Sequence, residues 1–146
     1  MTRDPDIRVY RPDREGIRKV LGDLEAEIME FVWAHPAKGS TVRDVFETLS
    51  KRRRIAYTTV MTTMARLARK KLLRAQRHGQ AYVYSSNFTE EEFVSRFVGR
   101  ILENLLISFT GVTLAQLKAV SDPRAVSRAP QILARIARRR AQEEKP

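Results

Sequence analysis

The sequence predicts a mainly α-helical protein with a small β-hairpin, organised as a winged helix-turn-helix domain followed by a helical dimerisation segment. Three observations predict this fold class: two short helical patterns precede a long basic one, a hairpin signal follows it, and a broadly apolar helical pattern comes next. The 146 residues give room for one small domain and such a segment. We expect an N-terminal arm at 1–20, the winged helix at 21–87, dimerisation at 88–121 and a basic tail at 122–146.

The arm contains two prolines and a glycine, which argue against a long helix. Two interpretations stay open. One is a mobile, untethered tail, and the other is an arm that lies along DNA, as some N-terminal arms do. The arginines that such an arm would use are Arg3, Arg8, Arg11 and Arg14.

Two amphipathic helices are expected next. The first begins near Asp23, a favourable N-cap, and ends before Pro36. The second begins with the capping pair Thr41 and Asp44, and its apolar residues recur at helical spacing from Val42. The apolar stripe of the first helix consists of Leu24, Ile28, Phe31 and Val32, with Trp33 near its end.

Residues 51–80 concentrate the positive charge of the chain. They include ten of the 28 Lys and Arg residues but none of the 17 Asp and Glu residues, and the whole chain has a net charge of +11. Such a concentrated field implies a polyanionic partner, and double-stranded DNA is the first candidate.

Within this stretch, residues 58–70 form a helical pattern with two faces. The face expected to pack inward has Val60, Met61, Met64, Ala65, Leu67 and Ala68. The outward face has Thr58, Thr59, Thr62, Thr63, Arg66, Arg69 and Lys70. Threonines are poor helix formers, but they are short and can contact a phosphate, a base edge or a thymine methyl group. This pattern is typical of a helix that reads the major groove.

A hairpin is expected directly after this helix. Residues 72–77 and 80–86 have strand-forming patterns, and Gly79 supplies the positive φ of a tight turn. Arg77 and His78 lie near the tip, as in a wing that contacts the DNA backbone. The full set of DNA-binding candidates is Thr41, Arg54, Tyr57, Thr58, Thr59, Thr62, Thr63, Arg66, Arg69, Lys70, Arg77 and His78.

The helix expected from Thr89, with a capping partner in Glu92, is apolar over much of its circumference. A small domain has little core to bury such a surface, so we expect a homodimer. The dimerisation candidates are Phe93, Phe97, Ile101, Leu102, Leu105 and Leu106. Gly111 is expected to end this helix and Thr113 to cap a short one, and a basic helix is expected over residues 131–141.

Composition argues against several other functions. The chain has no cysteine and only two histidines, so we expect no enzyme, no metal site and no cofactor. The acidic run Glu90, Glu91 and Glu92 is explained by the dipole of the helix that it begins. No apolar run is long enough for a membrane span and no signal peptide begins the chain, so we expect a cytoplasmic protein.

Four segments together resemble the penicillinase-repressor family, which includes regulators of β-lactamase and methicillin resistance and copper-responsive repressors. They are LGDLEAEIMEFVW, TVRDVFETL, IAYTTVMTTMARLARKKLL and QAYVYSSN. The resemblance implies a dimeric winged-helix repressor that binds an inverted repeat. It also implies that Thr58, Thr59, Thr62 and Arg66 read the major groove, with Arg77 in the wing.

Two departures from the family leave the inducing signal open. Copper-responsive members use C-terminal cysteine pairs, which this chain does not have. Members inactivated by a sensor protease are cut at Asn-Phe in the dimerisation region, whereas the Asn-Phe of this chain is Asn87-Phe88, at the end of the wing. A sensor protease and a small effector both stay open as partners. Non-specific or architectural DNA binding and ligand sensing remain the alternative functions.

Overall fold

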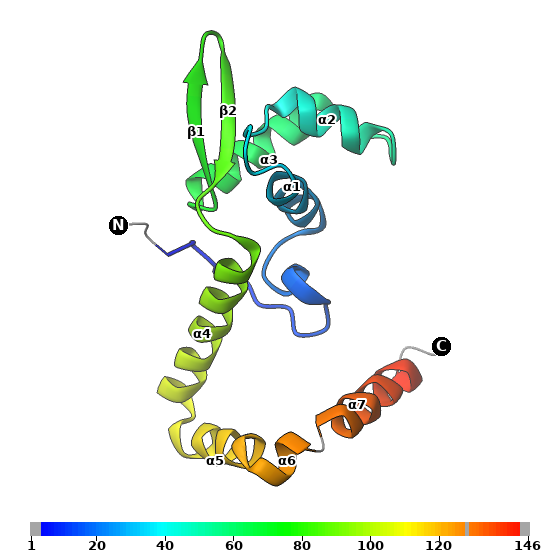
Figure 1. The fold of residues 1–146 in the computed structure, drawn as a ribbon, viewed down its shortest axis with the longest axis vertical. Coiled ribbons are helices and arrows are strands. Elements are labelled where there is room, and N and C mark those ends of the chain that lie inside the picture. The colour runs from blue at the N-terminus through cyan, green and yellow to red at the C-terminus, as the bar shows by residue number, and fades with distance from the viewer. Residues whose placement is uncertain (1–3, 128, 144–146) are drawn as a thin grey trace. The chain divides into compact units, whose positions relative to one another are not determined.

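The computed structural model describes residues 4–127 and 129–143, and it divides the chain into two compact units, residues 1–99 and 100–146. The prediction of a mainly helical fold with one hairpin is confirmed (Figure 1). The elements are the 3-10 helix η1 (Gly16–Lys19), α1 (Asp23–Ala34), α2 (Val42–Ser50), α3 (Tyr57–Arg69), β1 (Leu73–His78), β2 (Ala81–Ser86), α4 (Glu90–Ser108), α5 (Thr110–Ser121), α6 (Pro123–Ser127) and α7 (Ala129–Glu143).

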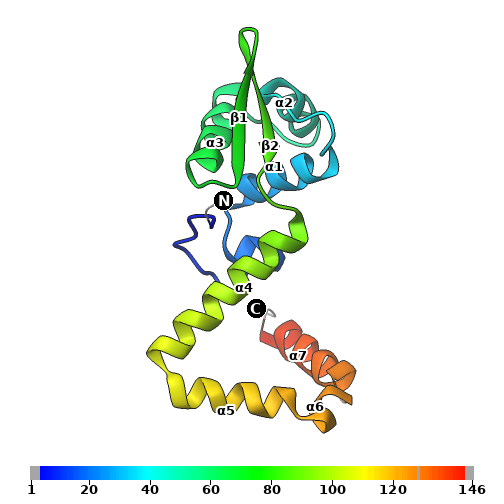
Figure 2. The same cartoon turned by 60° about the vertical axis from the view of Figure 1, so that its left-hand side comes forward.

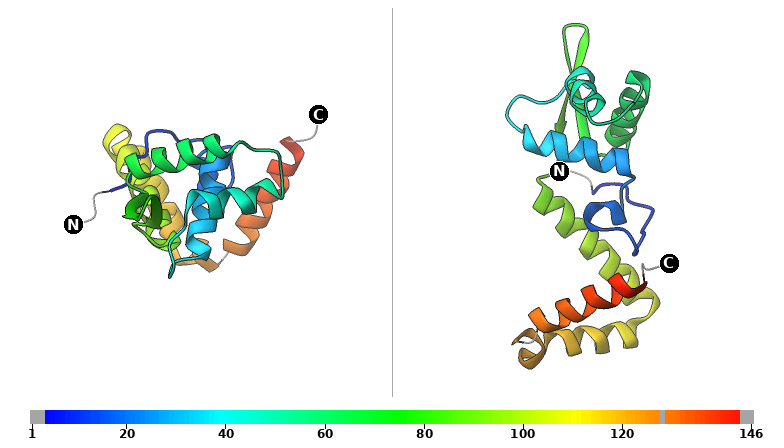
Figure 3. Two further views of the ribbon diagram at one scale, coloured as in Figure 1. Left: turned by 90° about the horizontal axis from the view of Figure 1, so that it is seen from above. Right: turned by 90° about the vertical axis from the view of Figure 1, so that its right-hand side faces the viewer.

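The core of the first unit lies among α1, α2 and α3, and α3 packs against both of the other helices (Figure 3). These helices can pack closely because apolar residues recur at helical spacing on one side of each. The fully buried side chains include Ile28 and Met29 from α1, Val45 from α2, and Met64 and Leu67 from α3.

The helix starts show which capping signals the chain uses. The pair predicted for α2 is present, because the Thr41 hydroxyl accepts from the Asp44 amide at 3.1 Å and the Asp44 carboxylate accepts from the Thr41 amide at 3.0 Å. The N-cap predicted for α1 is wrong: Gly22 is the N-cap, and Asp23 is the first helical residue. The carboxylate of Asp23 instead pairs with Arg14, and this hydrogen bond holds its pKa below the ordinary value of 3.8.

The hairpin forms with the predicted turn. β1 and β2 are antiparallel, His78 pairs with Ala81, and Gly79 has a φ of +65°. The hairpin projects beyond the helices of its unit (Figure 2). A second glycine, Gly39, lies close to strand β2. Its φ is +67°, and a Cβ atom at this position would lie 2.5 Å from Val83 Cγ1. The neighbouring Ser40 can therefore exchange two backbone hydrogen bonds with Tyr84, each 2.8 Å long.

The described part of the N-terminal arm packs against the other elements of the first unit, so the interpretation as an untethered tail is wrong. Pro5 is buried, and the Asp6 amide donates to the Lys70 carbonyl at 2.9 Å. Asp4 forms an ion pair with Arg96 of α4. Of the arginines considered for DNA contact, Arg8 pairs with Asp6, Arg14 pairs with Asp23, Arg11 is exposed, and Arg3 lies outside the described residues.

The first half of α4 belongs to the winged helix, which corrects two dimerisation candidates. Phe93 is fully buried and Phe97 is 6% exposed, and their rings lie 5.4 Å apart. Phe93 also packs at 5.7 Å from Trp33 of α1. These two rings therefore complete the core of the first unit and are not available to a partner chain. For the same reason the first unit extends to residue 99, beyond the boundary that we expected after residue 87.

The second unit contains the end of α4 with α5, α6 and α7. The break expected at Gly111 occurs at Phe109, whose φ of −137° and ψ of 57° interrupt the helix, and α5 begins at Thr110 instead of Thr113. Many apolar side chains are exposed here: Ile107 at 79%, Val120 at 69%, Val112 at 68% and Phe109 at 63%. In the part of the chain that the structure describes, every helix is too short or too polar to cross a membrane.

Candidate nucleic-acid interface

The outer face of α3 is the centre of the candidate site. Thr58, Thr59, Thr62 and Arg66 are exposed as predicted, and they line one shallow depression of about 510 Å³ together with the start of α1. Arg69, one turn further along, is exposed as well. In this part of α3, short polar side chains leave the helix backbone accessible to a groove.

Two residues of α3 face the opposite way from the prediction. Thr63 is only 5% exposed, and its hydroxyl donates to the Thr59 carbonyl at 2.7 Å. Met61 is 44% exposed. The prediction is wrong for both residues because of their positions around the helix axis. At 100° per residue, Thr63 lies about 60° from the buried Val60, whereas Met61 lies about 100° away. A tighter angular limit around Val60 and Leu67 would have found Met61 from the sequence.

Contacts at both ends fix the position of α3. Near its start, Tyr57 packs edge-on against Phe46 of α2, with ring centroids 5.4 Å apart. At its end, Lys70 Nζ lies 2.7 Å from Glu25 Oε2, and the same carboxylate caps α1 through the Gly22 amide at 3.1 Å. Glu25 therefore links the start of α1 to the end of α3, a connection that sequence patterns do not reveal.

The turn from α3 into the hairpin is also defined. Lys71 has a φ of +67°, in the left-handed region that favours glycine. This conformation lets the Leu72 amide donate to the Leu67 carbonyl at 3.0 Å, which closes the helix end. The side-chain amide of Asn87 then donates to the Lys71 carbonyl at 2.8 Å. Helix and hairpin thus follow each other without a flexible linker.

Most of the basic stretch has no acidic partner. Among the described residues, only Arg53 and Lys70 of its ten bases form ion pairs, and Arg53 pairs with Glu27 at 2.7 Å. Arg54, Arg66, Arg69 and Arg77 therefore retain their full attraction for a polyanion. The guanidinium of Arg77 donates to the Gly79 carbonyl at 3.1 Å, which places it at the hairpin tip beside His78.

The remaining DNA-binding candidates lie at the ends of α3 or on other elements. Thr41 caps α2, so its hydroxyl is already engaged, and Arg54 lies in the turn before α3. Tyr57 is 45% exposed at the first position of α3. Lys70 is half-buried in its ion pair with Glu25. The structure therefore places five candidates around one depression, namely Thr58, Thr59, Thr62, Thr63 and Arg66. The others lie at the two ends of α3, at the start of α2, in the basic turn and in the wing.

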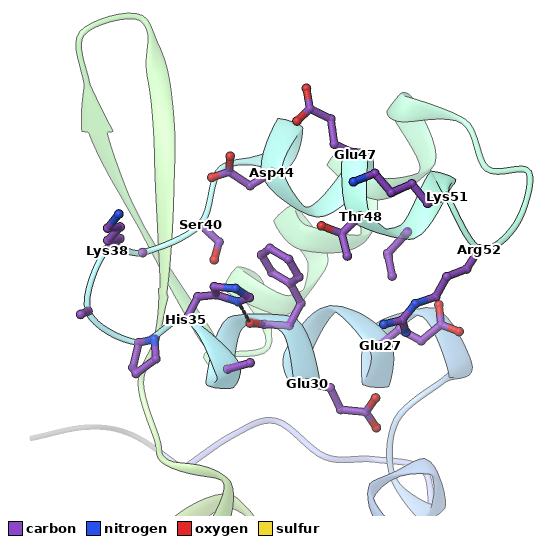
Figure 4. A pocket seen from close by; sticks show the side chains of 16 residues that line it. Glu27, Glu30, His35, Lys38, Ser40, Asp44, Glu47, Thr48, Lys51 and Arg52 are labelled. Atoms are coloured by element: carbon purple, nitrogen blue, oxygen red, sulfur yellow. Dashed lines mark hydrogen bonds between the residues drawn. The ribbon is translucent and has the colours of Figure 1, made fainter.

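A second depression, of about 860 Å³, lies between α1 and α2 (Figure 4). Its acids are engaged: Glu27 pairs with Arg53, Glu30 pairs with Arg18 at 3.2 Å, and Asp44 caps α2. His35 stacks on Phe31 and its Nδ1 lies 2.9 Å from the Phe31 carbonyl oxygen. These contacts hold the loop after α1 in place. Within the described residues, no three His, Asp or Glu side chains are placed to hold a metal.

Comparison with known proteins adds independent information. The family model described as penicillinase repressor matches residues 21–126. "Transcriptional regulator BlaI" of Mycobacterium tuberculosis is 44% identical over 75 residues, which cover 51% of this chain and 54% of that protein. "Penicillinase repressor" of Bacillus licheniformis is 27% identical over 97 residues, which cover 61% of this chain and 74% of that protein. The chain thus spans about half the length of the mycobacterial relative.

Two solved structures are also similar. The solution structure of the DNA-binding domain of the repressor BlaI has 28% identity and a TM-score of 0.44, and covers 54% of this chain and 93% of that one. The crystal structure of MepR, a transcription regulator of a Staphylococcus aureus multidrug efflux pump, has 20% identity and a TM-score of 0.42. It covers 72% of this chain and 78% of that one.

Proposed function

This chain belongs to the penicillinase repressor family, and from that premise we propose that it is a sequence-specific DNA-binding repressor of transcription that acts as a homodimer on an inverted repeat. The observation that carries the proposal is the outer face of α3. It presents Thr58, Thr59, Thr62 and Arg66 on a helix that contains no acidic residue, and a hairpin with a basic tip follows this helix. This arrangement fits a helix in the major groove and a wing on the adjacent backbone.

The homodimer is supported by the second unit. Leu105, Ile107, Phe109 and Val112 are between 42% and 79% exposed, which is unfavourable in water unless another surface covers them. Ile101, Leu102 and Leu106 are partly exposed on the same helix as Leu105. A two-fold symmetric pair of recognition helices would read two half-sites of opposite orientation, which is the reason for expecting an inverted repeat.

A second candidate is non-specific DNA binding, which the net charge of +11 favours. Selection from a pool of random-sequence DNA duplexes, using the full chain at physiological salt, separates the two candidates. The proposal predicts enrichment of an inverted repeat with half-sites about one helical turn, or a multiple of it, apart. A pool that stays random after repeated rounds would favour binding by charge alone and would contradict the repressor proposal.

The release of the repressor from DNA is a separate question. Phe88 is only 4% exposed, and its carbonyl accepts from Trp33 Nε1 at 2.9 Å. A protease would have to unfold this segment to cut at Asn87-Phe88, so we propose that release does not occur by cleavage there. Limited proteolysis of the folded chain checks this: early cutting at Asn87-Phe88 would contradict it.

A further inference from the structure

We propose that Met61, together with the methyl groups of Thr58 and Thr62, reads the 5-methyl groups of thymine in the major groove. On this proposal, each half-site contains a T·A pair opposite Met61, and Met61 is a specificity-determining residue. The inference rests on the proposed function, because it requires α3 to enter the groove. It adds to the proposed function which chemical group of the DNA, the thymine methyl group, the first half of α3 recognises.

An uncharged patch lies within the most basic part of the chain. Tyr57, Thr58, Met61 and Thr62 are all exposed in the first half of α3, whereas Arg66 and Arg69 lie in its second half. Thr58 is three residues before Met61 and four before Thr62, so the side chain of Thr58 is a neighbour of both on the helix surface. A helix surface in contact with water alone would favour Lys or Glu at these positions.

Met61 is the apolar centre of this patch. A single exposed apolar side chain is common on proteins and needs no explanation by itself. Here, however, the 44% exposed Met61 lies next to a 45% exposed Tyr57, on the helix that is expected to face DNA. Methionine is long, unbranched and adaptable, so it can reach from the helix to a base edge and adjust to its shape.

The hydroxyl of Thr62 points to the same chemistry. Thr62 Oγ1 donates to the Thr58 carbonyl at 2.8 Å, within α3 itself. The single hydroxyl hydrogen is therefore used inside the helix and is not available to a base acceptor. The methyl group of Thr62 remains as the group that can add apolar contact area beside Thr58.

The major groove offers one matching partner. Each base pair presents hydrogen-bonding groups there, but only thymine presents a methyl group. Loss of one buried methyl contact corresponds to about a fourfold increase in Kd. A thymine replaced by deoxyuridine loses this methyl group while all of its hydrogen-bonding groups remain. The substitution therefore isolates the contact that we propose.

The test uses the duplex enriched from the random pool and the full chain. Each thymine of the duplex is replaced in turn by deoxyuridine, and Kd is measured by fluorescence anisotropy. We expect one position in each half-site at which the wild-type protein loses about fourfold in affinity. Met61→Gln, which keeps the length but is polar, should abolish this loss. Met61→Leu, which stays apolar, should retain it.

Met64→Leu is the matched control, because Met64 is on the same helix but fully buried. Leucine conserves its volume, so this variant should keep the wild-type response to deoxyuridine. A preferred duplex that tolerates deoxyuridine at every position, or an unchanged loss in Met61→Gln, would overturn the inference while the repressor proposal stands. The absence of any preferred duplex would overturn both.

Discussion

At the scale of single residues, Arg66 is the side chain with the clearest expected role. It is exposed in the depression that also contains Thr59 and Thr62, and no ion pair engages it within the described part of the chain. A guanidinium in this position can donate two hydrogen bonds to the major-groove edge of guanine. It can also bind a phosphate, but that contact would not depend on sequence.

Arg66→Ala is predicted to weaken binding to the preferred duplex by about 1–3 kcal/mol more than binding to random DNA. The physical reason is that a bidentate base contact exists only on the preferred sequence. Anisotropy titrations on both duplexes give the difference directly. Arg139→Ala, which removes an exposed arginine of α7, serves as the control and should leave the ratio of the two affinities unchanged.

Lys71 is the residue whose backbone is least suited to its side chain. Its φ of +67° is costly for any residue with a Cβ atom. Lys71→Gly is therefore predicted to raise the free energy of unfolding by about 0.5–1 kcal/mol, measured by urea denaturation. At Lys51, where φ is −70°, the same substitution relieves no strain and should not stabilise the protein. A loss of stability in Lys71→Gly would contradict this account of the turn.

How far the sequence predicts side-chain orientation is illustrated within α3. Arg66 was placed correctly because charged side chains are almost always exposed. For Thr63 and Met61 the prediction is wrong, because a buried threonine and an exposed methionine are each unusual for the residue type and follow from the angle on the helix. The ion pair of Lys70 with Glu25 joins residues far apart in the sequence, and it depends on tertiary packing that no local pattern encodes.

At the scale of secondary-structure elements, local signals were reliable where one residue type satisfies a specific geometric need. Gly79 at the hairpin turn and the Thr41–Asp44 pair at the start of α2 are both present as predicted. Helix boundaries with weaker signals were wrong. Asp23 pairs with Arg14 instead of capping α1, and Gly111 lies within α5 because Phe109 has the non-helical conformation.

The wing should act through charge and not through base reading. Arg77→Ala is predicted to weaken binding to preferred and random duplexes equally, and to reduce the slope of log K against log salt concentration by about 1. This result follows if Arg77 contacts one phosphate from the hairpin tip. Arg77→Lys keeps the charge and should keep the slope. A selective loss on the preferred duplex would instead assign base contact to Arg77.

At the scale of the whole molecule, the division into two units explains which dimerisation predictions the structure contradicts. Phe93 and Phe97 continue the apolar pattern of α4, and the sequence therefore predicts them at the dimer interface. The apolar residues of this helix, however, have different environments before and after residue 100. Before residue 100, Phe93 and Phe97 fill the core of the winged helix, and after residue 100 the apolar residues of α4 are partly or largely exposed. Periodicity alone cannot show at which residue the apolar side chains stop filling the core and become exposed.

The homodimer is tested by placing charge on the exposed apolar surface of the second unit. Leu105 is 42% exposed and Ile107 is 79% exposed. Burying carboxylates in an interface is unfavourable. The double variant Leu105→Asp with Ile107→Asp is therefore predicted to sediment as a monomer. It should also bind the inverted repeat no more tightly than it binds a single half-site. Val9→Asp, at an exposed apolar position of the first unit, should remain dimeric. A wild-type protein that sediments as a monomer at all concentrations tested would contradict the proposal.

The central claim is that this chain recognises a DNA sequence and does not merely bind DNA by its charge. The most direct test is fluorescence anisotropy with the enriched duplex and a scrambled duplex of equal length, at low and at physiological salt. We predict a preference of about a thousandfold or more at the higher salt concentration. Equal affinities that fall together as salt rises would show that charge accounts for all of the binding, and would contradict the repressor function.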